Sequence, residues 1–532
     1  MGRADILYSL LFLGSTLLWL ANLGPFSWPL LSILTAISLL CKEQGILFLV
    51  FWFSLEWFKL KINRRKMLSR EFLSVNLYIL LNLVALSWFR MWVMEYKAPV
   101  WQRGDNPAAM EESTVTRLLT FNYIYLLNMW IVLVPEWLCF DWAMGCIPPV
   151  TPADLRAGTV LLIWAAILAI TLKYRKKIKE HNFLIHFSLS LILSPFILSM
   201  NVFVYVGFVI AERNLYLSIA GYSFLLTSGF NRLCGIKAFS QRLSRFLMIL
   251  LFLTFILRSH IRSCHWRNEM DLFTSGLNVC YYNAKVHYNI AKKLADQNDS
   301  EQAMLFYKES LRLQPDYEHA LNNLGNLLKS QQKFSEAEMM FKRAVRVSPT
   351  FAAAHMNLGI VYAGQGRYAE AEQSYLLALH HRLQYPDCQF NLGNLYIKTR
   401  QSGWAEERYR LAAERGHQLA TANLIILLDE QNRMEEAHAL ILQAHQHFPT
   451  NAEFSFQLAN SFGKQGMFTQ SEANYMKAIG LQNKAIYWSN LGVLYHRWNK
   501  IEEAIEAYQT ALNIDSTLKN AKVYLKKLLS KM

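Results

Sequence analysis

The chain has 532 residues, a formal net charge of +15 and 53% hydrophobic residues. At about 100–200 residues per domain, this length predicts about two to four domains. The apolar content excludes a disordered chain. Nearly all long apolar runs lie in residues 1–258, whereas 284–531 has the pattern of soluble amphipathic helices, so a soluble single-domain enzyme is also excluded. The densest basic clusters lie between apolar runs, as charge that flanks membrane spans does, and we therefore expect no nucleic-acid partner.

The first half contains apolar segments close to the length of about 20 residues with which a helix crosses a bilayer. We expect membrane spans at 5–23, in some or all of 28–57, and at 71–94, 158–172, 183–200, about 215–231 and 246–258. Lys42 and Glu43 interrupt the second of these segments. They belong either to one long span with a buried pair or to a turn between two short spans, and a plain turn with solvated charges is the third alternative.

The orientation follows from three basic segments, which the positive-inside rule assigns to the cytosol: 59–66, 173–179 and 232–245. The loops on the opposite side are then luminal: 95–118, 136–157 and 201–214. Each span moves the chain to the other side of the membrane, so a full crossing by 119–135 would place 173–179 in the lumen. We therefore expect 119–135 to be re-entrant or interfacial, and the chain after residue 258 to lie in the lumen. The sequon that begins at Asn298 lies in a predicted turn between helices, so Asn298 is a candidate glycosylation site.

The seven cysteines are irregularly spaced, without a CxxC or Cys/His pattern, and we expect no metal site. Cys139 and Cys146 are close enough in sequence to pair if their loop faces an oxidising compartment. The alternative is that both are free thiols.

From residue 284 onward the sequence repeats with a period of about 34 residues, which is the period of tetratricopeptide (TPR) repeats. The pattern predicts seven repeats over 284–517 and a capping helix at 518–532, stacked as an α-solenoid with a concave groove. Small residues such as Gly359 and Gly393 allow the paired helices of a repeat to approach closely.

One polar position recurs in each first helix, two residues before a small residue in every repeat except the fifth, where Ile425 follows. It holds Asn289, Asn323, Asn357, Asn391, Asn423 and Asn490, and the sixth repeat has Gln457. Helical geometry directs this position toward the concave face. A row of carboxamides both donates to and accepts from a peptide backbone, so the row is a candidate binding device for client peptides. The alternative is an ordinary feature of the repeat, with each asparagine bonding locally.

Several strings resemble the transmembrane and tetratricopeptide-repeat O-mannosyltransferase (TMTC) family over essentially the whole chain. They are GRADILYSLLF (2–12), CKEQGI (41–46), RMWV (90–93), DNPAA (105–109), LTFNY (119–123), WLCFDWAMGCIP (137–148) and AERNLYLSIAGY (211–222). The resemblance implies an all-α chain with a polytopic GT-C-like membrane domain at 1–258, a family-specific loop region at about 90–157, a connector at 259–283 and the solenoid.

The resemblance also implies an activity and a location. Members of the family transfer mannose from dolichyl-phosphate mannose to Ser/Thr of luminal, cadherin-like proteins in the endoplasmic reticulum. The resemblance therefore implies a multi-pass protein of the endoplasmic reticulum membrane whose repeats are luminal. Its substrate in the membrane would be the dolichol-linked donor, and no further cofactor is implied.

The chain also departs from the family pattern. In the family, the GRAD string follows a first span and a luminal loop with an acidic pair, whereas here it begins at residue 2. We expect the usual catalytic carboxylate to be absent from this sequence. Three interpretations remain open: the chain is a shorter isoform of a family member, its sequence is incomplete, or it is an inactive relative. A smaller departure is the absence of the proline that usually follows Leu217.

Transfer from a lipid phosphate sugar needs a carboxylate that takes the hydroxyl proton and cations that stabilise the departing phosphate. The acids of the luminal loops within the family strings are Asp105, Asp141 and Glu212, and the candidate cations for the donor phosphate are Lys42 and Arg213. Each acid has a structural alternative. Asp105 could cap a helix, Asp141 could bond within its tryptophan-rich loop, and Glu212 could pair with Arg213.

The sequence thus predicts a protein O-mannosyltransferase that is inverting if displacement is in-line, with a solenoid that presents client protein. The alternative from another class is a non-catalytic membrane scaffold whose luminal repeats bind a partner protein.

Overall fold

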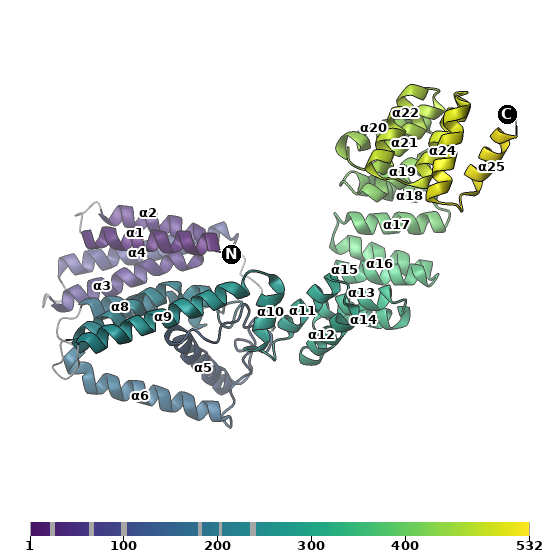
Figure 1. Cartoon of the computed structure of the whole chain (residues 1–532). Helices are drawn as coiled ribbons and strands as arrows, with labels where there is room; N and C mark the ends of the chain where they lie inside the picture. The colour runs from purple at the N-terminus through teal and green to yellow at the C-terminus, as the bar shows by residue number, and fades with distance from the viewer. Residues whose placement is uncertain are drawn as a thin grey trace. The chain divides into compact units, whose positions relative to one another are not determined.

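The computed structural model describes residues 2–21, 27–62, 69–96, 104–178, 183–201, 205–234 and 241–530. Every regular element in these ranges is a helix, which confirms the all-α class. The helices form two compact units, Met1–Ala320 and Leu321–Met532 (Figure 1). Of the three expected basic segments, residues 63–66, 179 and 235–240 lie outside the described residues.

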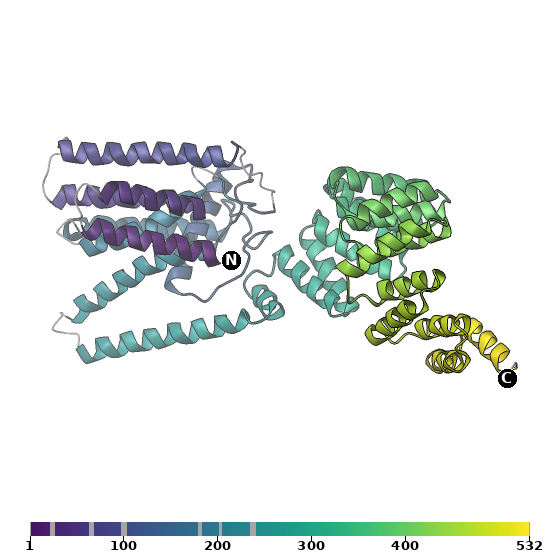
Figure 2. The same ribbon diagram turned by 90° about the horizontal axis from the view of Figure 1, so that it is seen from above.

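The first unit begins with the apolar helices. They are α1 (Gly2–Ala21), α2 (Ser27–Cys41), α3 (Leu47–Ile62), α4 (Arg70–Val93), α5 (Thr114–Leu133), α6 (Leu155–Ile178), α7 (Phe183–Leu193), α8 (Tyr216–Cys234) and α9 (Gln241–His265). Within the described residues, three short 3-10 helices connect them: η2 (Glu43–Ile46), η3 (Ser194–Met200) and η4 (Glu212–Leu215). Most of these helices run along a common direction within this unit (Figure 2).

Four helices of the described chain are long and apolar enough to cross a membrane. They cover Ala4–Ala21, Phe72–Val93, Leu155–Lys173 and Gln241–His265. Only 6% of the most apolar stretch of α4, and of that of α9, is buried within the structure. Leu, Ile and Phe side chains therefore cover the surfaces of these helices, as on helices that face lipid. Shorter apolar helices occupy Trp28–Cys41 and Phe183–Ile197. Of the segment 119–135, expected to be re-entrant or interfacial, residues 119–133 lie in α5.

The segment 28–57 is divided rather than continuous. Helix α2 ends at Cys41, η2 follows Lys42, and α3 begins at Leu47. Gly45 permits this turn because a Cβ there would lie 2.4 Å from the backbone nitrogen of Leu39. Of the alternatives for this segment, the structure therefore has two short helices that meet at a turn.

Aromatic side chains pack α1 against α3. Phe48, Phe51 and Trp52 lie on one face of α3, because residues three and four apart share a helix face. The ring of Phe12 on α1 contacts the first two, with centroids 4.7 and 5.0 Å apart. These rings are at most 1% exposed, and they form the centre of this hydrophobic cluster.

The repeats are regular helical hairpins. The first unit continues with α10 (Glu269–Leu277), α11 (Ala284–Asp296) and α12 (Ser300–Leu313), and the second begins within α13 (Glu318–Ser330). The remaining helices are α14 (Phe334–Val347), α15 (Ala352–Gly364), α16 (Tyr368–His381), α17 (Pro386–Lys398), α18 (Ser402–Ala413), α19 (Gln418–Glu430), α20 (Met434–His447), α21 (Ala452–Lys464), α22 (Phe468–Leu481), α23 (Ala485–Arg497), α24 (Ile501–Ile514) and α25 (Lys519–Leu529).

A glycine allows the two helices of a repeat to touch. In the hairpin of α17 and α18, a Cβ on Gly393 would lie 2.6 Å from the ring of Tyr409. The same contact occurs between Gly359 and Tyr375, at 2.7 Å. Both rings are 2% exposed, so they have no free space into which to move. The expected close approach of the paired helices is confirmed.

We predict that Gly393→Ala destabilises the solenoid by about 1–3 kcal/mol, because the added methyl group overpacks the buried Tyr409 ring. The matched control is Gly403→Ala in α18, where an added Cβ meets nothing within 4 Å. The helical unfolding transition, followed by circular dichroism, should fall in temperature only for Gly393→Ala. Equal transitions for both variants would contradict this account of the hairpin.

Candidate functional site

Lys42 lies in a network that joins three parts of the first unit. Its ammonium forms an ion pair with Asp5 of α1 and donates to Asn214 Oδ1 of η4 at 3.0 Å. Asn214 in turn donates to Ser199 Oγ at 3.3 Å. The Lys42 and Asp5 side chains are 15% and 18% exposed, so the alternative of solvated charges at this turn is wrong for Lys42.

Asp5 is a candidate acid that the sequence analysis missed. It belongs to the GRAD string, whereas the candidate bases predicted from the sequence all lie in the loops. The signal was present, since a carboxylate in the first turn of an apolar helix is costly unless it pairs or lines a polar cavity. Beside it, Glu43 pairs with Arg90 of α4, so the η2 turn carries two ion pairs.

Glu212 of η4 holds the loop 137–148 in place. One carboxylate oxygen accepts from the backbone N–H of Cys139 at 2.6 Å and from Trp142 Nε1 at 3.0 Å. Burial raises the pKa of Glu212 above its usual range, and the two hydrogen bonds oppose that rise. The neighbouring Arg213 is exposed. In the described structure Glu212 bonds to this loop instead of forming the expected pair with Arg213.

Asp141 connects the same loop to the first repeat. Its carboxylate forms an ion pair with Lys285 at 2.6 Å and accepts from the N–H of Ala143 at 2.9 Å. Its backbone carbonyl accepts from Asn283 Nδ2 at 2.9 Å. Asp141 therefore forms a hydrogen bond within its loop, as the structural alternative for this residue predicted. It also bonds outside the loop, to Lys285 and Asn283.

Asp105 is half-buried beside an organising asparagine that the sequence analysis did not single out. The buried Asn106 donates to the carbonyls of Val206 and Phe208, at 2.8 and 3.2 Å, and accepts from the N–H of Ala109. The capping alternative for Asp105 is wrong, because the next helix, α5, is capped by Ser113.

A disulfide joins Cys146 to Cys280, which precedes the first repeat. Cys139 is a buried free thiol whose pKa burial raises to about 12. The expected alternatives of a Cys139–Cys146 pair or two free thiols are therefore both wrong for Cys146. Next to the bond, Gly145 has a φ of +90°, and a Cβ there would lie 3.0 Å from the Tyr282 carbonyl oxygen.

The short helix η4 brings the candidate residues together in two groups. Its Glu212 faces the loop that carries Asp141, and its Asn214 faces Lys42 and Asp5. The carboxylate and ammonium of the second group have the charges needed to take a proton and to bind a phosphate. Among the described residues, no group of three or more His, Cys, Asp or Glu side chains is arranged to hold a metal ion.

A large apolar cavity of about 840 Å³ lies among α5, α6, α7 and α8. Trp164, Phe196 and Phe230 contribute to its walls, and the few polar side chains include Asn128 and Tyr125. The two polar groups are already bonded, because Asn128 donates to the carbonyl of Ile124 and Tyr125 to that of Met200. The cavity thus offers an apolar surface suited to a hydrocarbon chain.

The asparagine row is partly engaged in bonds between neighbouring helices. Asn357 is 6% exposed, donates to Asn322 Oδ1 at 2.9 Å and accepts from Lys329 Nζ at 3.2 Å. Asn423 donates to Asn394 Oδ1 at 3.1 Å. The other members are half-buried: Asn289, Asn323, Asn391 and Asn490. At least two asparagines of the row therefore hold neighbouring helices of the solenoid together.

The sequon asparagine Asn298 lies in the turn between α11 and α12. It is exposed and has a φ of +64°, a conformation that asparagine adopts more readily than most residues. The side chain is accessible at this position.

Comparison with known proteins gives matches along the chain. Residues 95–168 match the family profile described as "Protein O-mannosyl-transferase TMTC, DUF1736". Residues 284–317, 322–384 and 485–518 match tetratricopeptide-repeat profiles. The resemblance to the TMTC family is confirmed.

The curated relatives carry names from the TMTC family. Human "Protein O-mannosyl-transferase TMTC4" is 38% identical over 337 residues, which cover 58% of this chain and 45% of the relative. Mouse "Protein O-mannosyl-transferase TMTC1" is 36% identical, covering 50% and 29%. Drosophila melanogaster "Protein O-mannosyl-transferase Tmtc3" is 33% identical, covering 61% and 39%. The chain thus spans less than half the length of these relatives.

We predict that Glu212→Ala exposes Cys139, because the Cys139 N–H and the Trp142 indole lose the acceptor that holds their loop. Loss of bonds to a charged group should raise maleimide labelling of Cys139 by about ten-fold or more, as counted by peptide mass spectrometry. Glu212→Gln is the control, since both bonds end on one oxygen that an amide retains. Similar labelling of the two variants would contradict this role.

Proposed function

We propose that this chain is a protein O-mannosyltransferase of the endoplasmic reticulum membrane. It transfers mannose from dolichyl-phosphate mannose to Ser/Thr hydroxyls of luminal, cadherin-like client proteins. The observation that carries the proposal is the match of residues 95–168 to the TMTC profile, because that segment includes the loop organised around Glu212. The names of the relatives support the same general reaction.

The donor would bind at the η2 turn and in the apolar cavity. Lys42 and the exposed Arg213 carry the positive charge that a phosphodiester needs, and the cavity would take the polyprenyl chain. Lys42 now pairs with Asp5. Binding of the donor phosphate to Lys42 would release the Asp5 carboxylate, which then stands ready as a base for the acceptor hydroxyl.

Client protein would lie along the solenoid, where the carboxamide row faces the backbone of a peptide. The bonds of Asn357 and Asn423 hold these amides in fixed orientations, so little rotamer entropy is lost on binding. The luminal location of the repeats is supported by the Cys146–Cys280 disulfide, because disulfides persist in oxidising compartments.

A membrane scaffold without catalysis is the second candidate. The observation in its favour is that Asp141 and Glu212 are both bonded within the fold. In the scaffold, the loops serve to hold the first repeat, and the solenoid alone carries function.

We predict that membranes containing this chain add hexose to a cadherin ectodomain supplied with dolichyl-phosphate mannose. Lys42→Met and Asp5→Asn should each lower transfer by about 100-fold or more, since a phosphate partner or a base is lost. Glu136→Gln, in an exposed ion pair with Arg258, is the control. Mass spectrometry counts the added hexose.

The assay is run in parallel with the chain joined to a family-type upstream segment. Formation of the Cys146–Cys280 bond checks that each variant folds. Absence of transfer from both forms would reject the enzyme and favour the scaffold.

The orientation can be tested separately. We predict that Asn298 carries an N-glycan in cells, because it is exposed in a turn of repeats that we assign to the lumen. Endoglycosidase treatment should increase the gel mobility of the protein and leave Asn298→Gln unchanged. An unmodified Asn298 together with repeats that are cut by protease from the cytosolic side would contradict this orientation.

A further inference from the structure

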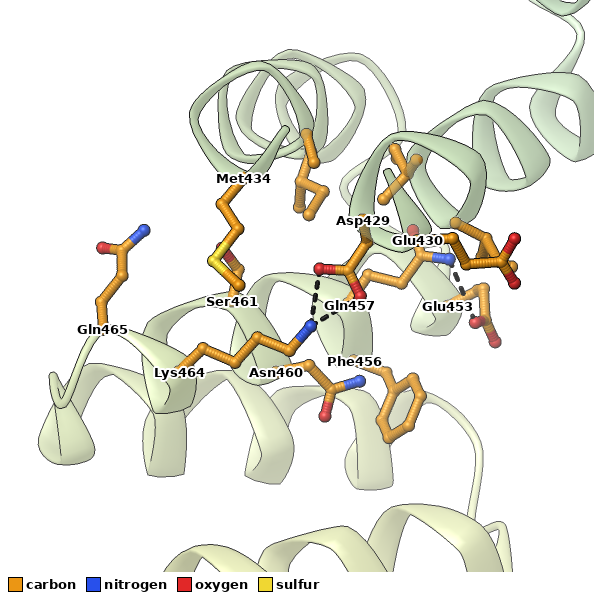
Figure 3. A pocket seen from close by; sticks show the side chains of 14 residues that line it. Asp429, Glu430, Met434, Glu453, Phe456, Gln457, Asn460, Ser461, Lys464 and Gln465 are labelled. Atoms are coloured by element: carbon orange, nitrogen blue, oxygen red, sulfur yellow. Dashed lines mark hydrogen bonds and ion pairs between the residues drawn. The ribbon is translucent and has the colours of Figure 1, made fainter. Parts of the chain in front are cut away.

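A pocket of about 360 Å³ opens between α19, α20 and α21 in the second unit (Figure 3). Ile425, Ala437 and Ile441 form its apolar part and are at most 4% exposed. The side chains of Phe456 and Met434 lie at its edges. The pocket thus has a wall on which an aliphatic stem can pack.

The charged residues that line this pocket are mostly acidic. They are Asp429, Glu430, Glu453 and Lys464. Lys464 is bound to both carboxylate oxygens of Asp429, at 2.6 Å each, so this ammonium and one carboxylate neutralise each other. Glu430 and Glu453 leave an excess of negative charge in a chain whose net charge is +15.

Gln457 provides a second, independent observation. It is 7% exposed, and its amide nitrogen reaches Glu453 at 3.5 Å, whereas its carbonyl oxygen has no hydrogen-bond partner in the described structure. Figure 3 shows this amide between Asp429 and Glu453. A buried carbonyl without a donor is unfavourable, and an incoming N–H group would remove that penalty.

We propose that this pocket binds an arginine side chain of a client segment that lies along the solenoid. The guanidinium supplies several N–H donors in a planar fork, enough for the free carbonyl of Gln457 and for the carboxylates of Glu430 and Glu453. Its three-carbon stem packs on the isoleucine wall. The pocket therefore selects for a charged side chain, whereas the asparagines of the carboxamide row contact only the peptide backbone. This inference rests on the client-binding part of the proposed function and is independent of mannose transfer.

The test uses the full chain in detergent micelles and two fluorescein-labelled nonapeptides of Ser, Thr and Gly. One has a central arginine and the other a central citrulline, which has nearly the same shape but no charge. Fluorescence anisotropy should give a Kd about ten-fold or more lower for the arginine peptide, as charge-assisted hydrogen bonds predict. The preference should fall in 0.5 M NaCl, because salt screens the exposed carboxylates.

Variants then test whether the preference for the arginine peptide arises in this pocket. The double variant Glu430→Gln/Glu453→Gln keeps the shape of the pocket and should reduce the preference to less than about two-fold. Glu502→Gln/Glu503→Gln removes two exposed carboxylates from α24 and should leave the preference unchanged. Gln457→Leu should weaken binding of the arginine peptide, with circular dichroism as the check on folding.

Equal affinities for the two peptides, or no binding of either at 1 mM, would overturn the proposal. A preference that survives the Glu430→Gln/Glu453→Gln change would also overturn it. Loss of mannose transfer with the arginine preference intact would instead reject only the proposed enzyme.

Discussion

The first unit depends on one joint between its central loop and the first repeat. We call this the loop–repeat joint, and it consists of Asp141, Met144, Cys146, Cys280, Asn283 and Lys285. A disulfide, an ion pair and two hydrogen bonds meet there: the Asn283 side chain donates to the Asp141 carbonyl, and the N–H of Ala284 donates to the Met144 carbonyl at 3.2 Å. Val286 and Ile290 of α11 pack in the same hydrophobic core as Phe121 and Trp142. The first repeat is therefore part of the fold that contains the loops, and its position relative to η4 is fixed.

Ion pairs play a different part in the solenoid, where they connect one hairpin to the next. Arg367 binds Glu338 of the preceding repeat at 2.9 Å, and Arg433 binds Glu406 in the same way at 2.7 Å. These pairs lie near the surface and contribute little stability individually. Their regular placement shows how a repeated sequence produces a repeated electrostatic pattern. The pocket beside Gln457 departs from that pattern, because Lys464 neutralises only one of its carboxylates.

The sequence predicted most of what local patterns determine and little of what depends on distant contacts. The repeat pattern predicted the close approach of the paired helices at Gly393, but it did not predict that Tyr409 of the same hairpin packs against this glycine. The acids of the loops could be named, but the partners of Glu212 lie about 70 residues away, and Lys285 lies farther still from Asp141. A single sequence carries no signal for such pairings. Asn106 was missed for another reason, because an uncharged side chain in a loop does not identify itself as an organising group.

The disulfide has a consequence for biosynthesis. Cys146 and Cys280 are 134 residues apart, and α6 to α9 lie between them. At about 5–20 residues per second, the ribosome needs on the order of ten seconds to deliver the second thiol after the first. During that interval Cys146 is without its partner thiol, and the four apolar helices α6 to α9 are synthesised before Cys280 is available. The bond can therefore close only after all four helices have been synthesised, and it links the loop 137–148 covalently to the segment that leads into the first repeat.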